Sequence, residues 1–213
     1  MLFRSLREIA RMAMEHDLIV LSDEPYEHIL FDGHRHISIG SFEGMAERTI
    51  SAFTLSKSYA MTGWRVGYTV APPAVIDEME KLMEHMVSGV TAVAQRAALS
   101  AIAAPRDCVQ EMVATYDKRR QIVYEGLNAI DGINCLKPES TFYAFPNIKS
   151  LGLSSWELAK NLVKEHQVAV VPGSIFGNAG EGYVRLSFAA SIEQLQDGIA
   201  RIARGVAALR RRK

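Results

Sequence analysis

The chain has 213 residues, 48% of them hydrophobic and 23% charged, which is close to ordinary globular usage and excludes a fibrous or wholly disordered protein. The length suits one large domain or two small ones. The 24 Lys and Arg residues balance the 24 Asp and Glu residues, so net charge directs the chain neither to nucleic acid nor to an anionic membrane. We therefore expect no nucleic-acid partner and no membrane partner.

The two cysteines point to a reducing environment. Cys108 and Cys135 form no CxxC pair and have no His at zinc-finger spacing. Because disulfides are rare in the cytosol, two isolated cysteines favour a reduced, cytoplasmic chain. No apolar run in the sequence approaches the ~20 residues that a membrane span needs.

The first hundred residues alternate helices with apolar strands. Ser5 and Glu8 form a capping-box pattern, which predicts a helix over residues 5–16. Apolar runs predict buried strands at 18–21, 49–56 and 65–73, and a helix follows with apolar residues at helical spacing. Buried strands bracketed by helices indicate a parallel sheet in an α/β layer structure. In such sheets ligands bind beyond the carboxyl ends of the strands, where Asp23 and Lys57 lie.

The second half of the chain has the pattern of a small α+β unit. Residues 91–130 are mostly helical, with a break at Pro105. Short strands are predicted at 133–136, 142–145, 168–171 and 183–188. Ser154 and Ser191 begin capping boxes and predict two further helices. We place the division between two domains at residues 1–105 and 106–213.

The segment SAFTLSKSYAMTGWRVGY carries the strongest chemical signal. Lys57 follows a strand in an apolar, small-residue setting, where lysine is uncommon. Two interpretations remain: a snorkelling lysine at a strand end, or a desolvated nucleophilic amine that forms Schiff bases with carbonyls. Arg65 lies eight residues further on and can hold a phosphate. Thr54, Ser56 and Ser58 supply hydroxyl groups for the same anion.

The segment SDEPYEHILFDG supplies a carboxylate and a phenol. Asp23 follows the first apolar strand and precedes Pro25, so it is either a turn residue or the partner of a protonated ring nitrogen. Tyr26, three residues on, would then direct its hydroxyl to the phenolic oxygen of the same ring. Each residue alone is more often structural, but their combination with Lys57 at strand ends favours a cofactor site.

Arg185 lies in the predicted strand YVRLSF. Alternation places Tyr183, Arg185 and Ser187 on one face and Val184, Leu186 and Phe188 on the other. An arginine in such a strand is expected to have a partner, either a carboxylate of the protein or the carboxylate of a substrate.

A cluster of imidazoles and a carboxylate allows a different class of protein. His28, Asp32, His34 and His36 suit zinc or another divalent metal in a metal-dependent hydrolase. The stretch GHRH also has the composition of a polar turn, and no HExxH motif accompanies it.

Four separated motifs, SDEPYE, SKSYAMTGWRVGY, VPGSIFG and YVRLSFA, resemble those of the class I/II pyridoxal-phosphate-dependent aminotransferases of fold type I. They occur in the family's order and cover nearly the whole chain. The resemblance implies a partial three-layer α/β/α large domain, which binds the cofactor, followed by a small α+β C-terminal domain that begins with an interdomain helix. It also implies transfer of an amino group from an amino acid to a 2-oxo acid, and a homodimer with its active site at the subunit interface.

The same resemblance implies roles for individual residues. Lys57 would form the Schiff base with pyridoxal 5′-phosphate and move the α-proton, and Arg185 would bind the α-carboxylate of the substrate. The remaining cofactor-binding residues would be Asp23 at the pyridine nitrogen, Tyr26 at the phenolic oxygen, and Thr54, Ser56 and Arg65 at the phosphate. Thr54 departs from the family, which more often has Ser or Gly there.

The sequence matches only a C-terminal portion of the family's pattern. Met1 stands where the Asn-Pro-Thr-Gly motif usually lies, and the N-terminal half of the large domain has no counterpart. We expect a transaminase by ancestry, and the alternative for this chain by itself is a non-catalytic, dimerising fragment. The pattern names no amino-acid donor and no 2-oxo-acid acceptor.

Overall fold

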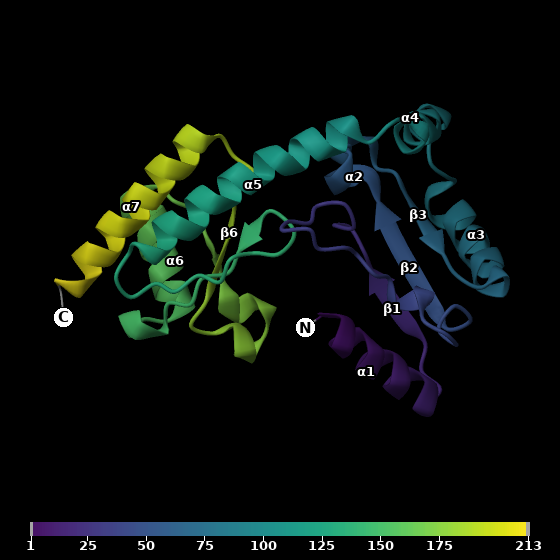
Figure 1. Ribbon diagram of the computed structural model, residues 1–213, viewed down its shortest axis with the longest axis horizontal. Helices are drawn as coiled ribbons and strands as arrows, with labels where there is room; N and C mark the ends of the chain where they lie inside the picture. The colour runs from purple at the N-terminus through teal and green to yellow at the C-terminus, as the bar shows by residue number, and fades with distance from the viewer. Residues whose placement is uncertain (1, 212–213) are drawn as a thin grey trace. The chain divides into compact units, whose positions relative to one another are not determined.

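The computed structural model describes residues 2–211 and has two compact units, Met1–Val109 and Gln110–Lys213. The predicted domain division at 105/106 lies a few residues earlier. Figure 1 labels the α-helices and the strands β1, β2, β3 and β6. The first unit holds α1 (Leu2–Glu15), β1 (Val20–Asp23), β2 (Thr49–Thr54), α2 (Leu55–Ser58), β3 (Gly67–Val70), α3 (Pro73–Val87) and α4 (Ala92–Ala103). Helix α5 (Asp107–Asn128) begins in the first unit and continues into the second.

The sheet of the first unit has the order β1-β2-β3. Strands β1 and β2 are parallel, as predicted, but β3 is antiparallel to β2, so the expectation of a wholly parallel sheet is wrong. A parallel connection needs a crossover that returns along the sheet. Helix α2 has only four residues, about 6 Å of helix, whereas the six residues of β2 extend about 20 Å. The chain therefore reverses at the end of β2 and pairs in the opposite direction.

Strand β1 is more exposed than its sequence predicts. It begins two residues later than the predicted 18–21 segment, and Ile19 and Leu21 are each 74% exposed. Helix α1 also begins before Ser5, which lies inside it, so the predicted capping box at Ser5 is wrong.

Two clusters of buried apolar residues stabilise the described part of the first unit. One joins Ala10 and Ala13 of α1 to Ile39 and Met45. The other comprises Leu55, Met61, Val66, Ala94 and Ala98, and it ties α2 and the following turn to α4. The second cluster thus packs the segment that carries Lys57 against a helix.

The second unit combines a three-stranded sheet with helices. Its strands β4 (Tyr143–Ala144), β5 (Val171–Pro172) and β6 (Val184–Ser187) pair in the order β4-β6-β5, all antiparallel. The same unit contains helix α6 (Ser155–His166) and helix α7 (Ile192–Arg210). The predicted capping boxes of Ser154 with Glu157 and of Ser191 with Gln194 are both confirmed.

The predicted strand at 133–136 is wrong. Only Asn134 pairs there, in an isolated bridge with Asn147. The side chain of Asn128 accepts from the Cys135 N–H at 3.0 Å and donates to the Cys135 carbonyl at 2.9 Å. Because a side chain satisfies this backbone, no strand is needed to do so.

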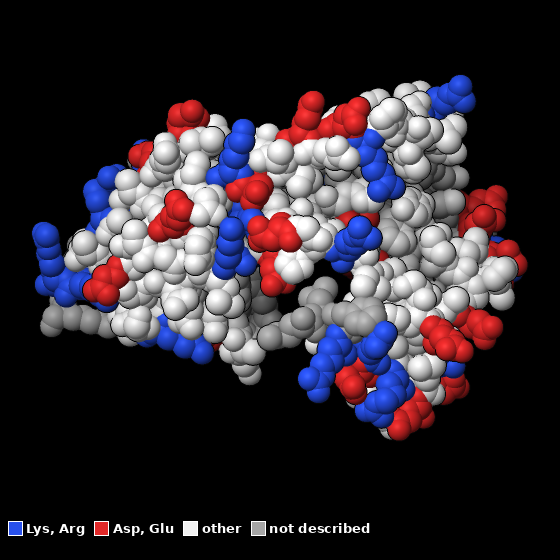
Figure 2. All heavy atoms as spheres, in the orientation of Figure 1, with Lys and Arg blue, Asp and Glu red and all other residues white. Residues whose placement is uncertain are grey.

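Both signs of charge are spread over the visible surface, often side by side (Figure 2). Ion pairs along the helices account for part of this pattern, among them Arg11 with Glu15 at 2.6 Å and Lys81 with Glu78 at 2.7 Å. Within residues 2–211, no helix has the length and apolar character of a membrane span.

Candidate active site

Strand register brings the predicted cofactor residues to one edge of the first unit's sheet. Asp23, the last residue of β1, pairs with Ala52 of the parallel strand β2. Thr54, the last residue of β2, pairs with Gly67, the first residue of β3. The end of β1, the end of β2 and the start of β3 therefore meet, and the segments that carry Lys57 and Arg65 begin and end there.

Lys57 lies on the short helix α2 rather than at a strand end. Its side chain is half-buried, between the buried residues Ser56 and Ser58. The hydroxyl of Thr54 caps the helix and accepts from the Ser56 N–H at 3.1 Å. The helix fixes the direction of Lys57, and the Thr54 hydroxyl keeps its own proton available for a second partner.

Arg65 closes the turn that follows α2. Its backbone is left-handed, with φ 51° and ψ 50°, an uncommon conformation for a residue with a side chain. Its Nη1 donates to the Thr62 carbonyl at 3.0 Å, and it forms no ion pair with any described carboxylate. The exposed guanidinium therefore keeps donors for an external anion.

Asp23 and Tyr26 lie where β1 ends. Asp23 is exposed and forms no ion pair within residues 2–211, whereas Tyr26 is half-buried in the turn that follows the strand. An exposed carboxylate at a strand end can face a cation that comes from outside the chain.

Glu24, which the sequence did not single out, anchors this edge. It is 5% exposed; its Oε2 lies 2.5 Å from His36 Nε2, and its Oε1 accepts from the Ser38 hydroxyl at 2.7 Å. Burial alone would raise the pKa of Glu24, but hydrogen bonds, first from His36, outweigh it and lower the pKa. The one sequence signal for this buried position was strand alternation, which places Glu24 and Asp23 on opposite sides of the chain.

The metal-binding alternative is wrong for the described residues. Among residues 2–211, no group of three or more His, Cys, Asp and Glu side chains is placed to hold a metal ion. His36 bonds to Glu24, and His28 packs edge-on against Tyr59 with ring centroids 6.0 Å apart. Asp32 and His34 are exposed in a turn. Burial lowers the pKa of His28, as expected for a neutral packed ring.

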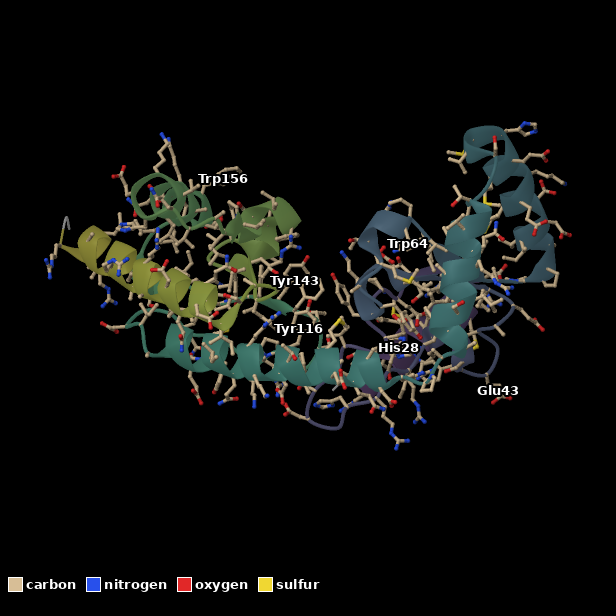
Figure 3. All side chains as sticks on the ribbon, turned by 90° about the horizontal axis from the view of Figure 1, so that it is seen from above. His28, Glu43, Trp64, Tyr116, Tyr143 and Trp156 are labelled. Atoms are coloured by element: carbon tan, nitrogen blue, oxygen red, sulfur yellow. The ribbon has the colours of Figure 1, made fainter. Side chains whose placement is uncertain are left out.

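Arg185 belongs to the second unit, on β6. Its guanidinium carbon lies 4.4 Å from the ring centre of Tyr143 and 4.7 Å from that of Phe176. Figure 3 labels Tyr143, one of these two rings. No described carboxylate forms an ion pair with Arg185. The interpretation as a structural salt bridge therefore has no support among residues 2–211, and the edges of the guanidinium remain available to an external carboxylate.

The donor set at the sheet edge fits pyridoxal 5′-phosphate. The exposed carboxylate of Asp23 suits a protonated ring nitrogen. The hydroxyl of Thr54 and the guanidinium of Arg65 suit a phosphate, and the half-buried amine of Lys57 suits the aldehyde.

Comparison with known proteins agrees with this chemistry. Residues 3–202 match the family described as aminotransferase class I and II. The chain is 46% identical to an aspartate aminotransferase of Pyrococcus abyssi over 201 residues, 93% of this chain and 51% of that protein. It is 44% identical to an aromatic-amino-acid aminotransferase of Thermococcus litoralis, with the same two shares covered.

Solved structures lead to the same family. The crystal structure of the aromatic aminotransferase from Pyrococcus horikoshii superposes with a TM-score of 0.92 at 44% identity, over 98% of this chain and 56% of that chain. The chain thus spans about half the length of the relatives it matches. On this evidence it belongs to the class I and II aminotransferase family.

Proposed function

We propose that this chain carries the lysine-bearing part of a pyridoxal-phosphate-dependent aminotransferase that exchanges amino groups between amino acids and 2-oxo acids. The observation that carries the proposal is the strand register, which brings the segments of Asp23, Thr54, Lys57 and Arg65 to one edge of the sheet. Family membership supports it, because the relatives that it matches are named aspartate and aromatic aminotransferases.

Each residue at this edge has a separate task in binding the cofactor. Asp23 keeps the ring nitrogen protonated through its exposed carboxylate, and Tyr26 donates its hydroxyl to the phenolic oxygen. Arg65 and the hydroxyls of Thr54 and Ser56 hold the phosphate. Helix α2 and the core cluster behind it keep these groups in place, because Leu55 is 1% exposed and Met61 is 9% exposed.

Lys57 is the group that moves protons. The bound cofactor supplies an electron sink for the electron pair that remains at the substrate α-carbon. Lys57 Nζ would hold the cofactor covalently in the resting state and, as a free amine, would carry the proton from the substrate α-carbon to the reacting carbon of the cofactor. The buried flanking residues Ser56 and Ser58 limit the approach of water to this amine.

Arg185 selects substrates that carry a carboxylate. Its guanidinium, packed on Tyr143 and Phe176, presents parallel N–H groups to the two oxygens of the α-carboxylate. This contact distinguishes amino acids and 2-oxo acids from simple amines and ketones, but not one amino acid from another.

We further propose that the protein acts as a homodimer in a reducing, cytoplasmic compartment. Family membership and exposed apolar residues on the first unit, such as Leu21, support a dimer. The free thiols of Cys108 and Cys135 support a reducing compartment.

Reductive labelling tests the proposal. The purified chain is mixed with pyridoxal 5′-phosphate and reduced with borohydride, and the modified lysine is mapped by mass spectrometry. We expect the label at Lys57 and its loss in Lys57→Ala. Lys81→Ala is the matched control, because Lys81 is exposed and its ion-pair partner among residues 2–211 is Glu78 on the same helix.

The labelling pattern separates the proposal from its alternative. If only exposed lysines such as Lys81 are labelled, the chain does not form a cofactor site and the catalytic proposal fails. A folded dimer that takes up no cofactor would identify the chain as the non-catalytic, dimerising fragment.

A further inference from the structure

Two aromatic rings contact the guanidinium of Arg185, and they are held in different ways. The guanidinium carbon lies 4.4 Å from the ring centre of Tyr143 and 4.7 Å from that of Phe176. Tyr143 belongs to β4, whose pairing with β6 places it opposite Ser187. Phe176 lies outside the strands and is 51% exposed, so burial in a core does not fix its position. The direction of the guanidinium therefore depends on the loop that carries Phe176.

Residues 173–183, the Phe176 loop, connect β5 to β6. The Gly173 N–H donates to the Tyr183 carbonyl at 2.8 Å and closes the base of the loop. The backbones of Gly173 and Gly180 approach so closely that a Cβ on either residue would overlap the carbonyl group of the other. These contacts lie within the loop, so they fix its shape rather than its position against the neighbouring helix.

Glu181 ties the Phe176 loop to the start of helix α6. Its Oε1 accepts from the Ser155 N–H at 2.7 Å, and its Oε2 accepts from the Ser155 hydroxyl at 2.8 Å. The Ser155 hydroxyl also lies 3.1 Å from the hydroxyl of Ser174, whose proton it can accept. Ser155 is buried and is the first residue of α6. One helix end thus meets two residues of the loop, one on each side of Phe176.

The negative charge of Glu181 suits this place. The first N–H groups of a helix have no partner within the helix and carry a partial positive charge. The hydrogen bonds from Ser155, first the one from its backbone N–H, lower the pKa of Glu181. The carboxylate is therefore ionised at neutral pH, and hydrogen bonds to an ionised acceptor are shorter and stronger than those to a neutral one.

We propose that Glu181 is a positioning residue for Arg185, because it anchors the Phe176 loop to α6 and so keeps the Phe176 ring packed on the guanidinium. An arginine whose direction is fixed in advance loses less conformational freedom when it binds a carboxylate. This consequence for substrate binding rests on the proposed role of Arg185. The positioning itself is a property of the second unit alone and requires neither the cofactor nor Lys57.

Nuclear magnetic resonance of the full chain, without cofactor, tests the proposal. An aromatic ring shifts the resonances of protons that lie over its face, so the δ-methylene and Nε–H protons of Arg185 report the contact with Phe176. An Arg185→Lys chain assigns these resonances, and a Phe176→Leu chain gives their positions without the ring. We expect Glu181→Ala to move them at least half of the way to their Phe176→Leu positions. Glu181→Gln keeps one acceptor oxygen, so it should move them in the same direction but less far.

Glu157→Ala is the matched control. Glu157 also accepts hydrogen bonds at the start of α6, from the Ser154 N–H at 2.8 Å and the Ser154 hydroxyl at 2.7 Å, but it is not part of the Phe176 loop. This variant should leave the Arg185 resonances in place. Circular dichroism checks that the variants fold, and Glu181→Gln carries the test if Glu181→Ala does not fold.

Three results would overturn the proposal. The first is unchanged Arg185 resonances in the Glu181 variants, and the second is an equal displacement in Glu157→Ala, which would trace the effect to any damage at the start of α6. The third is no displacement in Phe176→Leu, because the ring would then not contact Arg185 in solution. Lys57→Ala should leave the Arg185 resonances unchanged. Failure of the reductive labelling at Lys57 would therefore contradict the catalytic proposal and not this one.

Discussion

Two glycines of helix α7 should respond in opposite directions to the same substitution. A Cβ built at Gly198 meets no atom within 4 Å, whereas one built at Gly205 lies 2.8 Å from Leu162 Cδ2 and 2.9 Å from His166 Cδ2. Leu162 belongs to α6 and is 1% exposed, so its methyl group has little room to move. Comparing the two substitutions therefore separates the effect of helix propensity on stability from the effect of side-chain packing, within one helix.

The expected magnitudes follow from this geometry. Replacing glycine by alanine inside a helix stabilises it by about 0.8–1 kcal/mol. Gly198→Ala should show nearly all of this gain. At Gly205 the same gain is opposed by an overpacking cost of about 1–3 kcal/mol. Gly205→Ala should therefore be destabilised by up to about 2 kcal/mol, and the two variants should differ by about 1–3 kcal/mol.

Urea unfolding followed by tryptophan fluorescence can measure this difference. The chain has two tryptophans, Trp64 in the first unit and Trp156 on α6 in the second, both labelled in Figure 3. In a Trp64→Phe background the signal comes from Trp156 alone and reports the unit that contains α7. Equal free energies of unfolding for the two variants would refute the packing argument.

A double variant checks the cause. Leu162→Ala removes the methyl group that the new Cβ would meet, at a cost of its own of about 2–5 kcal/mol. In that background Gly205→Ala should no longer be destabilising and should recover part of the propensity gain. If the penalty persists unchanged, the contact with Leu162 is not its source.

Three further predictions concern other parts of the chain. Ser154→Ala removes the cap of α6, where the Ser154 hydroxyl accepts from the Glu157 N–H at 3.2 Å, and should lower the free energy of unfolding of the second unit by about 1 kcal/mol in the same urea assay. Burial raises the pKa of the Cys135 thiol to about 11, whereas Cys108 is exposed. At pH 8 a thiol reagent should therefore modify only Cys108 in the folded chain and both cysteines in urea. Rapid modification of both cysteines without urea would contradict this. Burial raises the pKa of Glu27 above its ordinary 4.5, so its ionisation costs stability as the pH rises through the folded-state pKa. Glu27→Gln should therefore raise the free energy of unfolding of the first unit at pH 7, as measured by Trp64 fluorescence in a Trp156→Phe background. This gain should disappear below about pH 4.5. A gain that does not depend on pH would exclude ionisation of Glu27 as its cause.

Local patterns predicted most of the helices and the position of the candidate site. The capping boxes at Ser154 and Ser191 involve residues three apart, so the sequence determines them without reference to the rest of the chain. The positions of Asp23 and Lys57 after apolar segments placed both residues at the same end of the sheet, because parallel neighbours β1 and β2 end together. That this end binds the cofactor stays a prediction.

The sequence could not determine which partners distant segments meet. The direction of β3 depends on how far α2 carries the chain, and the exposure of Leu21 depends on what covers the sheet. His36 resembled a metal ligand but bonds to Glu24, twelve residues away, because the intervening turn folds back on the strand end. The sequence predicted that Arg185 lies on a strand. It could not predict that the guanidinium packs on the rings of Tyr143 and Phe176, because these rings come from separate segments. Hydrogen bonds within a few residues are encoded locally, whereas strand direction, burial and side-chain pairing are fixed only when the tertiary structure brings those segments together.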